Sequence, residues 1–270
     1  MDRSLAALCL LSLSSSALAG VTYITDGRFV QAVNSFGQNA AHTPPVAFAP
    51  FNDTVQTTTV MSEGSCGSVS KHDSQLGTDQ MSGTGSVNAN AATLASSPLV
   101  FAGSGTSRFE VVFKPDASGN IRLVGELTGT AGKSTLRAEL KLGANVLFSK
   151  TTSGTFDFQT ISFADAEYKL TVSCAANSLL MWSGAPANAA SSASFSFTAD
   201  ISVGTCTGDL NDDGFVDDLD FAIFAPAYNI LDCADPTMPA GCPSDLNDDG
   251  LVDDLDFTLF APAYDALVCP

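Results

Sequence analysis

The segment Asp209-Leu210-Asn211-Asp212-Asp213-Gly214-Phe215-Val216-Asp217-Asp218-Leu219-Asp220 decides how the C-terminal part of this chain folds. It returns as DLNDDGLVDDLD at 245–256, an offset of 245 − 209 = 36 residues. In both copies, oxygen-bearing side chains stand at positions 1, 3, 5, 9 and 12, and glycine stands at position 6. A solvated acidic tail would not keep this register twice.

This spacing is that of the EF-hand calcium loop. Calcium is a hard cation that takes about six to eight oxygen ligands, so carboxylates must converge from one tight turn. Gly214 and Gly250 allow the positive φ of that turn. Phe215 and Leu251, at position 7, would offer only their backbone carbonyls. The pattern therefore predicts two calcium sites.

The duplication continues beyond the loops, where 221–228 (FAIFAPAY) matches 257–264 (FTLFAPAY). Apolar residues at helical spacing predict a short helix after each loop. In the first copy these residues are Leu219, Phe221, Ile223, Phe224 and Tyr228. Pro226 and Pro262 should kink these helices or end them early. No pattern typical of an entering helix precedes either loop.

A calcium loop with an exiting helix, present twice and with Asp at position 12, resembles the type I dockerin domain of secreted bacterial proteins. The resemblance covers roughly residues 206–270. It implies docking to cohesin domains of scaffolding or cell-surface proteins, often alongside polysaccharide-degrading enzymes. The metal ligands that it implies are Asp209, Asn211, Asp213, Phe215, Asp217 and Asp220, then Asp245, Asn247, Asp249, Leu251, Asp253 and Asp256. Asp217 and Asp253 would act through water.

Two departures from the family bear on the partner. Well-known dockerins often carry Ser-Thr at loop positions 10 and 11, where this chain has Asp218-Leu219 and Asp254-Leu255. The helices also carry no Lys or Arg. We therefore expect a partner with a complementary basic or apolar patch.

The charge of the chain is concentrated in the same region. Residues 206–270 hold 15 Asp and no Lys or Arg, which leaves 29 − 15 = 14 acids against 11 bases elsewhere. Without metal, these carboxylates would repel one another. Such an acidic surface argues against nucleic acid as a partner.

The N-terminus predicts secretion. An apolar run from Leu5 to Leu13 precedes Ala17-Leu18-Ala19, which suits cleavage of a signal peptide spanning 1–19. We find no other apolar segment of membrane-spanning length, so we expect no membrane span in the mature chain.

Six cysteines follow the predicted signal peptide. In an oxidising compartment, Cys66 and Cys174 are expected to pair with each other. The other four repeat at the same offset, and the symmetry of the repeats permits all three of their pairings. The dockerin arrangement, whose ends lie close together, favours Cys206–Cys269 and Cys233–Cys242.

Residues 20–204 read as a β-domain. Apolar–polar alternation marks the stretches 109–113, 121–127, 136–142, 168–174 and 195–203, and it is strict in the last three. Alternation with a period of two residues, which buries one face of a sheet and exposes the other to water, predicts an antiparallel sheet. The predicted fold class is mainly β: a jelly-roll-like β-sandwich at 20–204, followed by a small α, paired loop-helix domain at 205–270.

The β-domain offers little for catalysis. Lys71-His72-Asp73 is expected to be a solvated loop, and its neighbouring side chains would point to opposite faces of a strand. Glu110, Glu126, Glu139 and Glu167 fall on the polar phase of strands, where a solvent face is the ordinary interpretation. We therefore predict a non-catalytic protein.

Carbohydrate is the other ligand to weigh, because sugars stack on exposed aromatic rings. The domain offers Tyr23, Tyr168 and Trp182, of which Tyr168 and Trp182 are expected in the core. Three alternatives to docking stay open: a structural or adhesive surface protein, a carbohydrate-binding protein, and a glycoside-hydrolase accessory protein.

Overall fold

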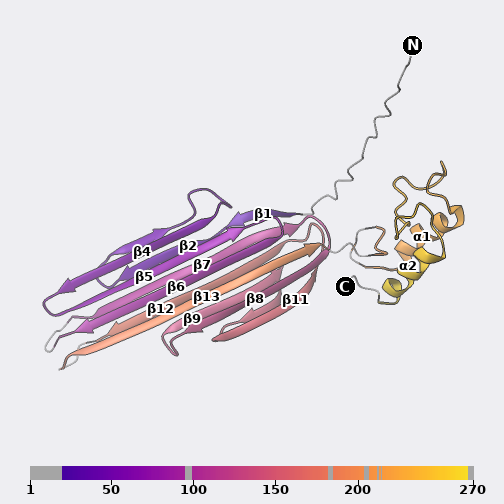
Figure 1. The fold of residues 1–270 in the computed structure, drawn as a ribbon. Coiled ribbons are helices and arrows are strands. Elements are labelled where there is room, and N and C mark those ends of the chain that lie inside the picture. The colour runs from indigo at the N-terminus through magenta and orange to yellow at the C-terminus, as the bar shows by residue number, and fades with distance from the viewer. Residues whose placement is uncertain are drawn as a thin grey trace, which may run out of the picture.

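Two antiparallel sheets packed face to face make up most of the computed structural model (Figure 1). The structure describes residues 20–94, 99–181, 185–203, 207–211, 213 and 215–266. The strands are β1 (Val21–Asp26), β2 (Phe29–Asn34), β3 (Asn39–His42), β4 (Phe51–Met61), β5 (Gly64–Leu76), β6 (Gln80–Thr93), β7 (Phe101–Pro115), β8 (Gly119–Gly129), β9 (Ser134–Leu142), β10 (Asn145–Lys150), β11 (Gly154–Ser162), β12 (Tyr168–Leu180) and β13 (Ala187–Val203). The helices α1 (Asp218–Ile230) and α2 (Asp254–Ala266) follow.

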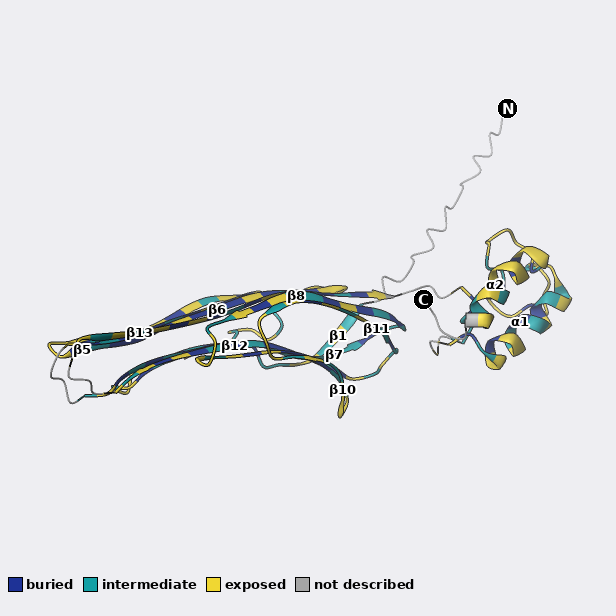
Figure 2. Ribbon diagram, turned by 90° about the horizontal axis from the view of Figure 1, so that it is seen from below, coloured by how far each residue is buried: buried dark blue, intermediate teal, exposed yellow. Residues whose placement is uncertain are grey.

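Within the described residues, one sheet has seven strands and the other has six. The first runs β10-β9-β12-β7-β2-β3, with β1 also paired to β7, and the second runs β11-β8-β13-β6-β5-β4. Figure 2 shows the two layers edge-on, with the helices beyond one end of the sandwich. The predicted β-sandwich is confirmed, and its jelly-roll-like topology stays a prediction.

Alternation of side chains decides which face of each strand is buried. Along β7, inward and outward residues alternate without a break over 15 residues. All five stretches singled out by their alternation lie in strands: β7, β8, β9, β12 and β13. Tyr168 is fully buried, as predicted. No described helix is long and apolar enough to cross a membrane.

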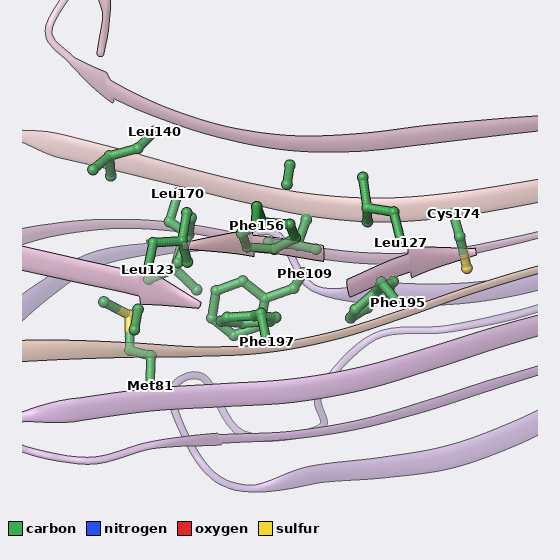
Figure 3. Packing of buried hydrophobic residues seen from close by; sticks show 14 of the residues in the cluster. Met81, Phe109, Leu123, Leu127, Leu140, Phe156, Leu170, Cys174, Phe195 and Phe197 are labelled. Atoms are coloured by element: carbon green, nitrogen blue, oxygen red, sulfur yellow. The ribbon is translucent and has the colours of Figure 1, made fainter. Parts of the chain in front are cut away.

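The main hydrophobic core fills the sandwich between β8, β12, β13 and the second half of β7 (Figure 3). Phe109 of β7 meets Phe197 of β13 edge to face across the two sheets, with ring centroids 4.7 Å apart. Burial of each such side chain contributes about 1.5–3 kcal/mol. This packing joins the sheets in that half of the sandwich.

The other half has two smaller apolar clusters, around Phe51 and Phe101, and polar contacts between the sheets at close range. The Ser68 hydroxyl of β5 donates to the Ser104 carbonyl oxygen of β7 at 2.6 Å, and Ser70 donates to the Gln31 carbonyl oxygen of β2 at 2.6 Å. A Cβ on Gly103 would collide with the backbone carbonyl of Gly67 in the facing sheet. Small residues therefore let hydroxyl groups of one sheet reach the backbone of the other.

The prediction of a solvated loop at residues 71–73 is wrong. His72 lies in β5 and is 1% exposed, while its neighbours Lys71 and Asp73 are exposed. Its two ring nitrogens lie 2.9 Å from the hydroxyls of Ser107 and Ser74. The alternation that places its neighbours outside places His72 between the sheets.

The predicted Cys66–Cys174 disulfide is also wrong, because both thiols are free and buried. Cys66 packs against Phe101, whereas Cys174 lies opposite Ser107 on the neighbouring strand. Phe101 and Ser107 are 107 − 101 = 6 residues apart along β7, about 20 Å at the rise of a strand. That separation is far beyond the reach of a disulfide.

Thiol mapping tests this correction. Burial raises the pKa of Cys174 to about 12, which keeps its thiol unreactive in the folded protein. We expect Cys66 and Cys174 to be alkylated only after unfolding without reductant, and Cys233 and Cys242 to be recovered as a linked peptide by mass spectrometry. Recovery of a Cys66–Cys174 crosslink would contradict the fold.

The environment of His72 predicts acid sensitivity. Burial, together with the nearby Arg28 cation, lowers the pKa of His72 from 6.5 to about 4. The unfolded chain therefore takes up this proton first, and stability falls as the pH drops from about 6.5 towards 4, by up to about 3 kcal/mol. Urea unfolding of the native protein and of His72→Gln isolates this effect. The Gln variant should lack that part of the pH dependence, and identical profiles would refute the assignment.

Candidate metal centre

Each acidic loop closes onto the carboxylate at its last position. Asp220 Oδ1 accepts hydrogen bonds from the backbone N–H groups of Leu210 at 2.7 Å and Asn211 at 3.1 Å. Its second oxygen, Oδ2, accepts from the N–H of Asp217 at 2.9 Å. The beginning of the loop, its ninth position and the start of α1 are thus tied to one side chain.

The second loop repeats this arrangement. Asp256 Oδ1 accepts from Leu246 N–H at 2.7 Å and from Asn247 N–H at 3.2 Å. Asp256 Oδ2 accepts from Asp253 N–H at 2.8 Å. Matching hydrogen bonds in both copies show that the sequence repeat is a structural repeat.

The early loop positions turn their side-chain oxygens towards one place. The N–H of Asp213 donates to Asp209 Oδ1 at 3.1 Å and to Asn211 Oδ1 at 2.9 Å. In the second loop, Asp249 N–H donates to Asp245 at 3.1 Å and to Asn247 at 3.0 Å. Gly250 has φ +90°, which explains the glycine at position 6 there. Asp212 and Gly214 lie outside the described residues.

The ligand atoms of the first loop lie close enough to share a cation. One carboxylate oxygen each from Asp209, Asp213 and Asp220 lies within 4.8 Å of the other two. The Asp220 and Asp256 side chains are 0% exposed, and no salt bridge of the described residues reaches either carboxylate. A buried carboxylate without a positive partner costs several kcal/mol. The backbone N–H groups stabilise these carboxylates in part, and the all-oxygen donor set of the first loop, with no cationic side chain beside it, fits a hard divalent cation such as calcium.

Asp217 has a role that the sequence pattern did not identify. It is the N-cap of α1, where its side chain accepts from Leu219 N–H at 2.8 Å in a capping box with Asp220. Asp253 makes the same bond to Leu255 N–H at 2.8 Å. A capping-box signal, Asp followed three residues later by an acidic residue, was present in both copies. Loop position 9 therefore fixes where each helix starts.

A second cluster of side chains that could bind a metal is explained by a disulfide instead. Cys233, Cys242 and Asp245 lie close together, but the two sulfurs form a disulfide. The predicted Cys233–Cys242 pairing is thereby confirmed. Cys206 and Cys269 lie outside the described residues.

The two helices pack about an approximate twofold axis. Phe224 stacks on Phe260 with ring centroids 4.8 Å apart. The Tyr228 hydroxyl donates to the Asp254 carboxylate at the start of α2, and Tyr264 donates to Asp218 at the start of α1. These carboxylates raise the pKa of both tyrosines. Each helix end is therefore bonded to the beginning of the other helix.

Pro226 and Pro262 do not end the helices early, contrary to one of the two expected outcomes. Both prolines lie inside helices that continue beyond them, to Ile230 and Ala266. Both are exposed, so each ring is accommodated on the solvent side. The predicted apolar stripe is only partly buried: Phe224 is 1% exposed, whereas Leu219 and Phe221 are 61% and 44% exposed.

Two glutamates considered for catalysis form ion pairs, and one aromatic residue considered for sugar stacking is buried. Glu110 pairs with Lys169 at 3.0 Å, and Glu139 pairs with Arg137 at 2.7 Å and Lys141 at 3.0 Å. Glu139 is buried rather than solvated as expected. Tyr168 is a core residue, and Trp182 lies outside the described residues.

No protein-family model and no curated protein matches the chain. One similar solved structure is titled "Structure of infectious bursal disease virus Gx strain", with 11% identity, a TM-score of 0.21, and coverage of 69% of this chain and 58% of that chain. Another, of the Gt strain, has 11% identity, a TM-score of 0.12, and coverage of 68% and 78%. The first match thus spans less than two thirds of that chain's length. TM-scores this low carry no argument about fold or function.

The buried carboxylates give the sharpest test of the metal site. Asp220→Asn removes one negative charge from the first loop and keeps one of the two oxygens that accept backbone hydrogen bonds. We expect this variant to bind one calcium ion instead of two in equilibrium dialysis, or to bind the first-loop ion at least about tenfold more weakly. Asp256→Asn should do the same for the second loop.

Asp218→Asn is the matched control, because Asp218 is exposed, precedes Asp220 by only two residues and is absent from the ligand set. It should bind two ions like the native chain. Equal binding by the native chain and by both ligand variants would contradict the site.

Proposed function

We propose that this chain is a secreted, non-catalytic protein whose dockerin-like module, residues 205–270, binds two calcium ions and docks to a cohesin-like domain. Its setting would be a scaffold or surface assembly, including one that breaks down polysaccharide. One observation carries the proposal: two loops with matching hydrogen bonds, each wrapped around a buried carboxylate that lacks a positive partner.

The exposed apolar residues of the helix pair supply a docking surface. Phe221 and Phe257 are each 44% exposed, although both belong to the aromatic cluster between the helices. Two hollows of about 260 and 250 Å³ flank this pair. Tyr264 and Asp265 border the first, and Tyr228 and Asn229 border the second, at equivalent positions of the two repeats. Exposed rings beside small hollows are typical of contact surfaces.

Charge specifies the partner further. Asp218, Asp254 and Asp265 are exposed near these aromatic residues, and the module has no Lys or Arg. A partner that fits would insert apolar side chains into the hollows and carry Lys or Arg around them. Calcium would act indirectly, because the ions fix the loops from which both helices start.

A structural or adhesive role is the second candidate. Phe215, at loop position 7, stacks on Phe163 of the sandwich with ring centroids 5.9 Å apart, and the Cys233–Cys242 disulfide ties the segment between the repeats. Both features would also suit a rigid cap on the sandwich that captures no partner.

Capture by recombinant cohesin domains separates the two roles. Immobilised cohesin domains should retain the full, oxidised chain in calcium and release it in a chelator. The double variant Phe221→Gln/Phe257→Gln should lose at least about tenfold in affinity while still binding two calcium ions.

Val146→Gln is the control, because Val146 is 53% exposed on the sandwich and its variant should be captured normally. Calcium binding without capture by any cohesin domain would favour the structural role, and retention of the double phenylalanine variant would exclude this surface.

A further inference from the structure

The two outer faces of the sandwich carry opposite charge. Outward positions of β7, β9 and β12 hold five cations and two carboxylates, a balance of 5 − 2 = +3. We call this surface the cationic face; its charged residues are Arg108, Glu110, Lys114, Arg137, Glu139, Lys141 and Lys169. Outward positions of the six-stranded sheet hold two cations and four carboxylates, a balance of 2 − 4 = −2: Lys71, Asp73, Arg122, Glu126, Asp157 and Asp200.

On the cationic face, each cation of an ion pair is more exposed than the carboxylate that it pairs with. Strand register places Glu139 and Glu110 on either side of Thr171, with Lys141 and Lys169 paired in the next outward row. The two carboxylates are only 11% and 26% exposed, whereas Arg137, Lys169 and Lys141 are 46%, 42% and 29% exposed. A docking surface would therefore meet ammonium and guanidinium groups above recessed carboxylates.

The same chain carries the complementary surface. Its last 65 residues hold 15 Asp without a single Lys or Arg. Two bound calcium ions would leave a charge of −15 + 4 = −11 there. Separation of charge on this scale steers association between oppositely charged surfaces.

We propose that the acidic C-terminal module of one copy docks on the cationic face of a second copy. The contact is heterologous, because two different surfaces meet. Each bound copy leaves one cationic face and one module free, so copies add head to tail. This assembly depends on charge complementarity and not on capture of a cohesin-like partner.

Analytical ultracentrifugation of the full, oxidised chain in calcium tests the contact. At an ionic strength of about 0.01 M, where charges act over about 30 Å, the average mass should rise with protein concentration beyond that of a monomer. At about 1 M salt it should return to the monomer. A monomer at every concentration and low salt would overturn the proposal.

Variants on each surface identify the contact. Arg137→Gln/Lys141→Gln/Lys169→Gln should weaken association about tenfold or more, and so should Asp218→Asn/Asp254→Asn/Asp265→Asn, which keeps the hydrogen-bond acceptors and all calcium ligands. The control Lys71→Gln/Arg122→Gln removes cations from the opposite face and should not weaken association. If the variant of the cationic face loses association but the variant of the module does not, the cationic face binds another sandwich face instead of the module. That result would overturn the proposal.

Discussion

The arrangement of the C-terminal module depends on two buried carboxylates. Asp220 and Asp256 each accept three backbone hydrogen bonds, which join the start of a loop to its ninth position and to the first turn of a helix. The same two side chains are fully buried with no basic residue in their module. Their charge is the reason to infer a cation, and their hydrogen bonds explain how that cation would control both helices.

The packing of α1 against α2 links the two loops to the surface proposed for docking. Each tyrosine near the end of one helix bonds to an aspartate at the start of the other, so the two repeats are linked directly. The stacked Phe224 and Phe260 fill the interior, and Phe221 and Phe257 stay half exposed beside it. The sandwich is built differently: a large aromatic core joins one half, and two small apolar clusters together with serine hydroxyls and close-packed glycines join the other.

The sequence predicted what is periodic or local. Alternation located β7, β8, β9, β12 and β13, and the repeat located both helices, because inward side chains of a strand and helical spacing follow from backbone geometry. It could not place Cys66 relative to Cys174, since their separation depends on strand order and register. The burial of His72 was not predicted, because its sequence neighbours Lys71 and Asp73 are charged and suggest an exposed segment. The continuation of α1 through Pro226 depends on the ring facing solvent, which local sequence does not specify.

The central claim is that these loops bind calcium, and isothermal titration calorimetry of the full, oxidised, metal-free chain tests it most directly. The account predicts two ions bound per chain, together with a rise in the thermal stability of the module as the loops fill. Absence of calcium binding would contradict the account, because the buried charges of Asp220 and Asp256 would then be stabilised by something other than a metal.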